Sequence, residues 1–417
     1  MQRASKVIVV GGGPAGLMAA GTAAAGGTRV VLLERMDRVG LKLGLTGKGR
    51  CNLTNLLPVR QMLPHYGAAA RFLRPSLGGF CNRTLIAFFE ELGVPTVVER
   101  GGRVFPQATN APGVARALRR WVRGTGVRIV TGARVERILV EKSRVIGAWA
   151  GDDFYRGDCV ILATGGMSYP RTGSTGDGFR LAAELGHSVV PLRPALVPLQ
   201  VPAEHWARDL AGLALKNVRV QALAAGRDLG NEFGEMLFTH TGVSGPIVLT
   251  LSRVVVDALR AGLPVELSID LKPALDVRKL DRRLLRELDA AGRRQIGGLL
   301  KNLLPRRLVS VCLAAIGIPF DRRADQCTRE ERRRLLGWLK AVPVEISEPG
   351  PAEEAIVTAG GVSLKEVEPK SMASRLVRGL YFAGEILDID ADTGGYNLQA
   401  AFSTGRQAGQ AAGECLL

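Results

Sequence analysis

The sequence has few of the residues that build metal centres and disulfide frameworks. In a chain of 417 residues, the six cysteines form no CxxC pair and the four histidines are dispersed. We therefore expect no structural zinc, no disulfide scaffold and no multi-histidine centre, and we predict no metal site.

Long apolar runs are also lacking. No stretch reaches the roughly 20 apolar residues that a membrane-spanning helix needs. Residues 1–6 lead directly into an apolar strand, without the pattern of a secretory signal. We expect a cytoplasmic protein that has no membrane partner.

Acidic residues are the minority among the charged residues. The 56 Lys and Arg outnumber the 39 Asp and Glu, which gives a formal net charge of +17. This charge attracts phosphate-bearing ligands. The arginines nevertheless lie singly or in short groups such as residues 332–334, with no aromatic-interleaved basic patch. A solvated basic surface is therefore favoured, and nucleic acid is the alternative partner.

The first 34 residues contain the strongest pattern in the chain. Residues 6–10 are predicted to form a strand buried on both faces of a parallel sheet, because the four residues after Lys6 are apolar and β-branched. The glycines Gly11, Gly13 and Gly16 follow at the spacing GxGxxG, then a helix is expected from residue 17 to 25, then a strand over residues 28–33 that ends at Glu34. A single glycine triplet is weak, but strand, glycines, helix, strand and acid together indicate a βαβ dinucleotide site.

Further elements are expected up to residue 190. We predict helices over residues 82–92, with Asn82 as N-cap, and over 112–123, and a strand over 127–130. Residues 134–140, 144–150 and 153–156 read as an antiparallel meander. Residues 158–163 form another buried strand, which ends in Ala-Thr-Gly, and a helix follows from about 177 to 185.

The composition of the sequence changes where prolines cluster, near residues 191–202 and again at 343–351. Strands are expected over 218–223, 236–239 and 265–271, followed by several helices over 276–339. Residues 191–351 are therefore predicted to be an inserted α+β domain. Residues 1–190 and 352–417 form the discontinuous nucleotide-binding domain.

Two further segments have the composition of cofactor-binding sequence. Residues 35–55 are Gly-rich and basic, and Lys42 and Arg50 can supply positive charge to phosphates. The alternative for this segment is a flexible surface loop. The tail contains a strand over 380–383, then Gly384 and Glu385, and a helix from Tyr396 to about residue 412 whose N-terminus can stabilise an anion or an electron-rich ring.

The choice between dinucleotides depends on what surrounds the first unit. The meander and the strand-Gly-Glu-loop-helix tail suit the isoalloxazine end of FAD, and a soluble nicotinamide cofactor needs neither. No second strand-GxGxxG-helix follows residues 163–165, where two-dinucleotide reductases bind NAD(P)H. FAD is therefore the predicted cofactor, and NAD(P)H as electron donor would have to bind in a less recognisable way.

At these motifs the chain resembles the BaiN/YhiN-like FAD-binding flavoproteins, also described as aminoacetone-oxidase-like or NAD(P)/FAD-dependent oxidoreductases. The resemblance is carried by residues 47–55 (GKGRCNLTN), 235–246 (EMLFTHTGVSGP), 383–388 (AGEILD) and 394–399 (GGYNLQ). It implies an α/β, GR2-type Rossmann-like FAD-binding fold, a parallel sheet with a β-meander, interrupted by an insert domain.

The resemblance also implies roles for single residues. The glycine turn would hold the pyrophosphate, Glu34 the adenosine ribose, and Val135 the adenine through its backbone, while the tail would approach the ribityl chain and flavin ring. Together with the residue patterns above, the candidate cofactor-binding residues are Gly11, Gly13, Pro14, Ala15, Gly16, Glu34, Arg35, Lys42, Arg50, Cys51, Asn52, Val135, Ala163, Thr164, Gly165, Gly384, Glu385, Gly394, Gly395, Tyr396, Asn397 and Leu398.

Two side chains are candidates for chemistry beyond cofactor binding. Cys51 has no second cysteine nearby, so a buried small residue is favoured over a redox thiol. His240, in the segment 238–246, is either an acid or base beside the flavin or a residue that fixes a Gly-rich turn by hydrogen bonds.

The sequence therefore predicts an FAD-dependent oxidoreductase that transfers hydride equivalents between flavin and an unidentified small organic substrate, bound between the two domains. The main alternative is a flavoprotein that modifies or binds RNA. A third interpretation is a redox sensor that uses FAD without catalysis.

Overall fold

A computed structural model describes residues 7–415. The chain divides into two compact units, one formed by residues 1–194 and 355–417 and the other by residues 195–354. Each unit has its own apolar core. The boundaries predicted from the proline clusters, 190/191 and 351/352, stay a prediction.

A parallel sheet forms the centre of the first unit. Its strand order is β20-β10-β1-β2-β6, and the paired strands run parallel. The strands are β1 (Val7–Val10), β2 (Val30–Glu34), β6 (Arg128–Thr131), β10 (Cys159–Leu162) and β20 (Leu380–Phe382). β1, β2, β10 and β20 are buried throughout, as a sheet covered on both faces requires. The predicted Rossmann-type fold is confirmed; Lys6, the first residue of the predicted strand, lies outside the described residues.

Smaller sheets surround the parallel sheet. β7 (Val135–Glu141), β8 (Arg144–Ala150) and β9 (Asp153–Arg156) form the predicted antiparallel meander. The other strands are β3 (Thr54–Asn55), β4 (Thr96–Val98) and β5 (Arg103–Pro106) in one sheet, and β11 (Val189–Ala195) and β19 (Val357–Val362) in another.

The helices of this unit are α1 (Pro14–Ala25), α2 (Val59–Met62), α3 (Ala70–Gly79), α4 (Asn82–Glu91), α5 (Ala111–Gly124), α6 (Asp177–Glu184) and α12 (Tyr396–Glu414). The N-cap predicted for α4 was wrong. Cys81 is the N-cap, and the amide of Asn82 instead donates to the carbonyls of Asn55 and Leu57, at 2.6 and 2.7 Å. Asn82 is therefore the first residue of α4, and two backbone acceptors fix its side-chain amide.

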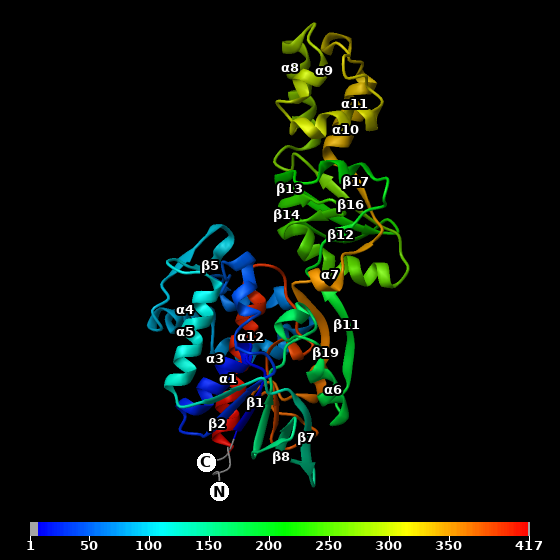
Figure 1. Cartoon of the computed structure of the whole chain (residues 1–417). Coiled ribbons are helices and arrows are strands. Elements are labelled where there is room, and N and C mark those ends of the chain that lie inside the picture. The colour runs from blue at the N-terminus through cyan, green and yellow to red at the C-terminus, as the bar shows by residue number, and fades with distance from the viewer. Residues whose placement is uncertain (1–6, 416–417) are drawn as a thin grey trace. The chain divides into compact units, whose positions relative to one another are not determined.

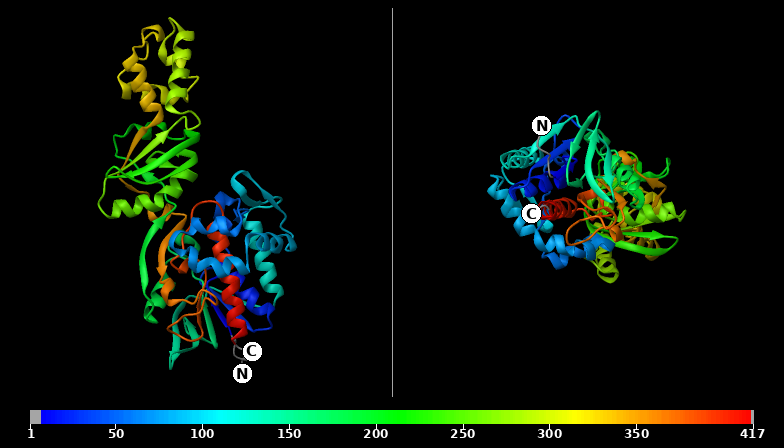
Figure 2. Two further views of the ribbon diagram at one scale, coloured as in Figure 1. Left: turned by 180° about the vertical axis from the view of Figure 1, so that it is seen from behind. Right: turned by 90° about the horizontal axis from the view of Figure 1, so that it is seen from below.

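Helix α12 packs along α1, and the two lie side by side in Figures 1 and 2. Glycines at four-residue spacing make this contact close. A Cβ at Gly405 would lie 2.4 Å from the Ala15 oxygen, and one at Gly409 would lie 2.3 Å from the Ala19 oxygen. From the first contact to the second, the residue number rises by four on both helices, so α12 runs parallel to α1.

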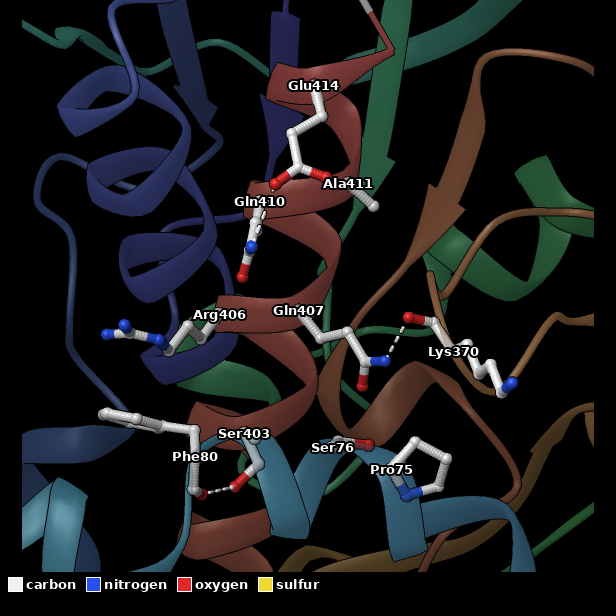
Figure 3. Close-up of a pocket in the computed structure, with 11 residues that line it drawn as sticks. Pro75, Ser76, Phe80, Lys370, Ser403, Arg406, Gln407, Gln410, Ala411 and Glu414 are labelled. Carbon is white, nitrogen blue, oxygen red and sulfur yellow. Dashed lines mark hydrogen bonds between the residues drawn. The ribbon is translucent and has the colours of Figure 1, made fainter.

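Polar contacts hold α12 to the end of α3 on another side (Figure 3). Ser403 and Gln399 donate to the Phe80 carbonyl oxygen, at 2.7 and 2.9 Å, and the Arg406 guanidinium lies 4.7 Å from the centre of the Phe80 ring. A small surface pocket adjoins these contacts, with Pro75 and Lys370 in its wall. The C-terminal helix is therefore fixed by both of its neighbours.

The second unit contains an antiparallel sheet with the order β17-β16-β13-β14-β15-β12-β18. Its strands are β12 (Leu199–Gln200), β13 (Ala214–Ala224), β14 (Arg227–Phe238), β15 (Gly242–Ser244), β16 (Val265–Asp270), β17 (Val342–Ile346) and β18 (Glu348–Pro349). Its helices are α7 (Pro246–Arg260), α8 (Val277–Ala291), α9 (Ile296–Leu300), α10 (Arg306–Ile316) and α11 (Arg329–Lys340). The predicted α+β class is confirmed. Among residues 7–415, no helix has the length and apolarity to cross a bilayer.

Candidate cofactor site

The glycine turn joins β1 to α1 at the C-terminal edge of the parallel sheet. Gly11 has φ +102°, and a Cβ there would lie 2.6 Å from the Ala163 oxygen; a Cβ at Gly16 would lie 1.8 Å from the Gly11 oxygen. These two positions therefore tolerate only glycine. A Cβ at Gly13, in contrast, would meet nothing within 4 Å.

The open position at Gly13 coincides with the start of α1. Gly13 is the N-cap, no side chain caps this end of the helix, and Pro14 occupies the first turn. The backbone N–H groups of the first turn and the helix dipole are therefore available to an anion. An uncapped helix end beside an empty space fits the pyrophosphate of a dinucleotide.

Glu34 lies at the end of β2, directly beside this turn. Its carboxylate accepts hydrogen bonds from the Gly12 N–H at 2.7 Å and the Met36 N–H at 2.9 Å. Burial raises the pKa of Glu34, and these two N–H groups oppose the rise. The glycine turn thus positions the carboxylate predicted to bind the adenosine ribose.

Arg35 and Val135 lie near this end of the site. Arg35 binds the Asp177 carboxylate at 3.0 Å and also donates to Thr175, and Arg134 binds Asp177 through two bonds of 2.9 Å. The hydrogen bonds from Arg134 are the main cause that lowers the pKa of Asp177. Val135 is buried at the start of β7. Arg35 therefore contributes to an ion-paired cluster beside the predicted adenosine site.

Two predicted cofactor residues pair with each other. The Lys42 ammonium lies 2.6 Å from the Glu385 carboxylate and 2.7 Å from the Ser168 hydroxyl. The other carboxylate oxygen of Glu385 accepts from the Thr358 N–H at 2.8 Å. Lys42 therefore ties the segment 35–55 to the segment after β20, and its contact with a phosphate stays a prediction.

The segment 35–55 is ordered around buried residues. Leu43, Cys51 and Leu53 are each fully buried, so the alternative of a flexible surface loop is wrong. Arg50 pairs with Glu99 and lies 4.2 Å from the centre of the Phe105 ring, and its contact with a phosphate stays a prediction. The segment is a structural part of the core, as well as a candidate cofactor-wrapping segment.

Two buried polar atoms in the site lack a hydrogen-bond partner among the described residues. They are Oδ1 of Asn52, in the segment 35–55, and Oγ1 of Thr164, directly after β10. A buried polar atom without a partner is costly, so such atoms call for a ligand. Both belong to the residues predicted to bind the cofactor. With the open turn at Gly13, they fit FAD.

Burial also decides the reactivity of Cys51. Burial raises its pKa to about 12, as it does for Cys159 and Cys312. At Cys81, burial opposes ionisation, but hydrogen bonds from the Thr84 side chain and from N–H groups of α4 outweigh it and lower the pKa.

We therefore expect iodoacetamide at about pH 8 to label Cys81 in the folded protein and to leave Cys51 unlabelled, because the thiolate is the reacting form. Mass spectrometry of peptides gives the ratio, and the same protein in urea, where both should be labelled, is the control. Equal labelling of Cys51 and Cys81 in the folded protein would contradict the interpretation of Cys51 as a buried, unreactive thiol.

The C-terminal segment reaches the site through η9 (Gly384–Ile386) and the start of α12. The Gly384 N–H donates to the Thr404 hydroxyl at 3.0 Å, and a Cβ at Gly384 would lie 2.7 Å from Cβ of Ala15. Gly395 is the N-cap of α12, without a capping side chain, and packs against Thr54. The N-terminus of α12 is therefore a second helix end without a capping side chain, and its contact with the cofactor stays a prediction.

The side chain of Asn397 is directed toward its own loop. Its Oδ1 accepts from the Ala391 N–H at 3.0 Å, and its Nδ2 donates to the Ala391 oxygen at 2.9 Å. Gly394, in the same loop, accepts a 3.4 Å bond from Asn55. Asn397 thus fixes the loop before α12, and a flavin contact by Asn397 or Leu398 stays a prediction.

The offset between α1 and α12 indicates where the reactive end of the cofactor lies. Gly405 of α12 lies against Ala15 of α1. Tyr396, the first residue of α12, precedes Gly405 by nine residues, whereas Pro14, the first residue of α1, precedes Ala15 by one. At a rise of 1.5 Å per residue, the N-terminus of α12 therefore extends roughly 12 Å beyond the N-terminus of α1. Glu34, the residue predicted to bind the adenosine ribose, ends β2, and β10 and β20 lie on the other side of β1. The second half of a dinucleotide would therefore run toward β10, β20 and the first turns of α12.

Sequence reasoning missed one functional candidate at this end of α12. His65 Nδ1 lies 2.7 Å from the Asp392 carboxylate, and the His65 ring stacks on the Tyr396 ring with centroids 4.2 Å apart. The two hydrogen-bonded residues are 327 positions apart in the chain. No local pattern around His65 signals this pairing.

His240 lies in the second unit, in the turn between β14 and β15, and is exposed. The Thr239 hydroxyl accepts from the Gly242 N–H at 3.0 Å, and the Thr239 N–H donates to the Gly242 oxygen at 2.8 Å. These contacts of Thr239 close the turn. An acid or base role for His240 stays a prediction.

Comparisons with known proteins agree with this geometry. Residues 5–411 match the family described as HI0933-like protein Rossmann domain. A 3-dehydro-bile acid delta(4,6)-reductase from Clostridium scindens is 33% identical over 412 residues, which cover 98% of this chain and 99% of the relative. A ribosomal RNA dihydrouridine synthase from Escherichia coli is 30% identical over 408 residues, with 95% of each chain covered.

A solved structure also matches nearly the whole chain. The 3-ketosteroid delta1-dehydrogenase from Sterolibacterium denitrificans has a TM-score of 0.54 at 14% identity, and the match covers 98% of this chain and 99% of that one. At this identity the likeness shows the fold alone.

Proposed function

The chain belongs to the HI0933-like protein Rossmann domain family, and on that premise we propose that this FAD-dependent oxidoreductase reduces a carbon–carbon double bond conjugated to a carbonyl group. The observation that carries the proposal is the 33% identity, over almost both full lengths, to a relative named as a delta(4,6)-reductase of 3-dehydro-bile acids. The double bonds in that name are conjugated to a ketone.

The relative named as a dihydrouridine synthase supports the same bond type. Dihydrouridine arises when the double bond of the uracil ring, which is conjugated to a carbonyl group, takes up two hydrogen atoms. The two names differ in substrate and agree in chemistry. The bond type is therefore better supported than either substrate.

The residues of the site support this chemistry by holding the cofactor. We assign the pyrophosphate to the turn from Gly11 to Gly16, the adenosine ribose to Glu34, and the flavin half to Asn52 and Thr164 with the first turn of α12. When bound, FAD supplies the hydride equivalents. NADH or NADPH is the proposed electron donor, and the cytoplasm is the proposed location.

A small apolar enone is the proposed substrate, and uridine in RNA is the second candidate. Two observations support RNA as this second candidate: the name of the Escherichia coli relative, and the net charge of +17, which attracts a phosphate backbone. His240 stays a candidate acid or base. Unchanged turnover in a His240→Ala variant would remove it.

The test uses the FAD-loaded full chain without oxygen. NADH and NADPH are tried as donors, and the reduced protein is mixed either with a 4-ene-3-oxo steroid or with a uridine-containing RNA. We expect the yellow flavin absorbance to return with one of them, and a product that has gained two hydrogen atoms by mass spectrometry. If neither compound reoxidises the flavin faster than buffer alone, the proposed function is wrong.

A further inference from the structure

The positive charge of the chain is concentrated in the helices α8 to α11 of the second unit. Residues 277–340 contain 17 Lys and Arg against 7 Asp and Glu, a net charge of +10 out of the +17 of the whole chain. These helices lie together at one end of the second unit (Figure 1). Charge of one sign over a limited part of the surface attracts a polyanion.

Exposed arginines form a straight row along α8. Arg278, Arg282 and Arg286 follow one another at a spacing of four residues, and all three are exposed. The leucine two positions after each of them is buried in the core of the unit. Two positions correspond to about 200° around a helix, so these three arginines, the α8 arginine row, face solvent on the side opposite to the core.

The carboxylates of α8 do not neutralise this row. Asp281 lies 2.8 Å from Arg332 of α11, and Glu287 lies 3.7 Å from Arg283. Asp289 is the remaining carboxylate of the helix. Within residues 7–415, the guanidinium groups of the α8 arginine row have no ion-pair partner. Their charges therefore stay available to another molecule.

Further exposed arginines lie beside this row, on α11. This helix packs against α8, and the ion pair between Asp281 and Arg332 joins the two. Arg329 and Arg333 are four residues apart, and both are exposed. Arg333 directly follows Arg332, and Arg282 directly follows Asp281, so the arginines of both helices flank the contact between them. The basic surface therefore extends over two helices.

We propose that the α8 arginine row, extended by Arg329 and Arg333, is a docking surface for RNA. The proposal rests on the RNA alternative of the proposed function, and it adds the surface that holds this partner. A guanidinium group binds a phosphate through two parallel, charge-assisted hydrogen bonds. Such contacts position the RNA backbone and do not read its sequence.

An anionic membrane is another polyanion, and the packing of α8 argues against it. A helix that lies on a bilayer inserts its apolar face into the lipid. In α8 this face is buried in the core of the unit, through Leu280, Leu284 and Leu288. Val277 is the large apolar side chain of α8 that is exposed, at the first position of the helix. A single valine does not provide a membrane-binding face.

The test measures binding of a fluorescent, uridine-containing single-stranded RNA to the FAD-loaded full chain, without a reductant. Anisotropy at several salt concentrations gives the affinity and its salt dependence. The variant combines Arg278→Gln, Arg282→Gln and Arg286→Gln. We expect the affinity to fall about tenfold or more, and the slope of log affinity against log salt to become shallower by about 2, since each phosphate contact on a single strand contributes about 0.7.

The matched control removes the same charge from the first unit. It combines Arg116→Gln, Arg120→Gln and Arg123→Gln, three exposed arginines of α5. We expect its affinity for the RNA to stay close to that of the unaltered chain, and thermal unfolding shows that both variants are folded. Equal losses in the two variants would mean that net charge alone attracts the RNA, and they would overturn the proposal. Unchanged affinity of the α8 variant, or binding to anionic phosphatidylglycerol vesicles without binding to RNA, would also overturn it.

The result is distinguishable from the test of the proposed function. Enone reduction by a chain that does not bind RNA would overturn the docking surface and leave the proposed function standing. RNA binding that depends on the α8 arginine row, without reduction of the enone or the uridine, would support the docking surface while the proposed function fails.

Discussion

The Gly13→Val variant is expected to be a folded, colourless protein. A Cβ at Gly13 meets nothing within 4 Å, and the residue has φ −77° and ψ −174°, which any amino acid adopts. The unfolding free energy of the FAD-free protein should change by less than about 1 kcal/mol. The side chain would, however, occupy the space assigned to the pyrophosphate. Loss of two hydrogen bonds to a charged group, at about 1.5 kcal/mol or more each, weakens FAD binding by about 100-fold or more.

Gly16→Ala provides the contrast to this variant. Its Cβ would lie 1.8 Å from the Gly11 oxygen, a backbone atom, so the substitution distorts the turn itself. We expect Gly16→Ala to lose thermal stability even without FAD. FAD titration followed by fluorescence, with thermal unfolding of the FAD-free proteins, separates the two effects. If Gly13→Val retains full FAD binding, the pyrophosphate is not where we place it.

The second large effect is expected at the contact between α1 and α12. A Cβ at Gly409 would lie 2.3 Å from the Ala19 oxygen, a backbone atom, so the two helices would have to move apart to accommodate it. We expect Gly409→Ala to destabilise the first unit by about 1–3 kcal/mol. The readout is the thermal midpoint of the FAD-free protein.

Gly413, on the same stripe of α12, provides a control of opposite sign. Its Cβ would find its nearest atom, Thr28 Oγ1, at 3.4 Å, an ordinary contact. Replacing a helical glycine with alanine there should stabilise the helix by about 0.5–1 kcal/mol. Equal effects of Gly409→Ala and Gly413→Ala would contradict the close helix packing.

The parts of the fold that the sequence predicts are those encoded by neighbouring residues. The βαβ unit ending at Glu34, the meander and α12 each have a local period, a glycine or a cap within a few positions. β14 was predicted only over its last residues, because Gly230 and Gly234 and its charged positions conceal the alternation. α7 was missed, since its apolar start after Pro246 resembles a strand.

In the candidate site, too, the sequence predicts the features that neighbouring residues encode and misses those that join distant segments. The glycine turn and Glu34 are linked by adjacent elements, and the structure places them together. The pairs Lys42–Glu385 and His65–Asp392 join segments more than 300 residues apart, so only the folded chain reveals them. The composition of residues 35–55 suggested a loop that wraps the cofactor, whereas buried side chains such as Leu43, Cys51 and Leu53 also anchor the segment in the core.

The central claim is that the chain holds FAD and passes hydride equivalents through it. The most direct measurement is the absorbance spectrum of the purified full chain, followed by denaturation and mass spectrometry of the released nucleotide. We predict a yellow protein that releases FAD, one molecule per chain, and that bleaches without oxygen when a nicotinamide donor is added. A colourless protein that does not take up added FAD would contradict the account.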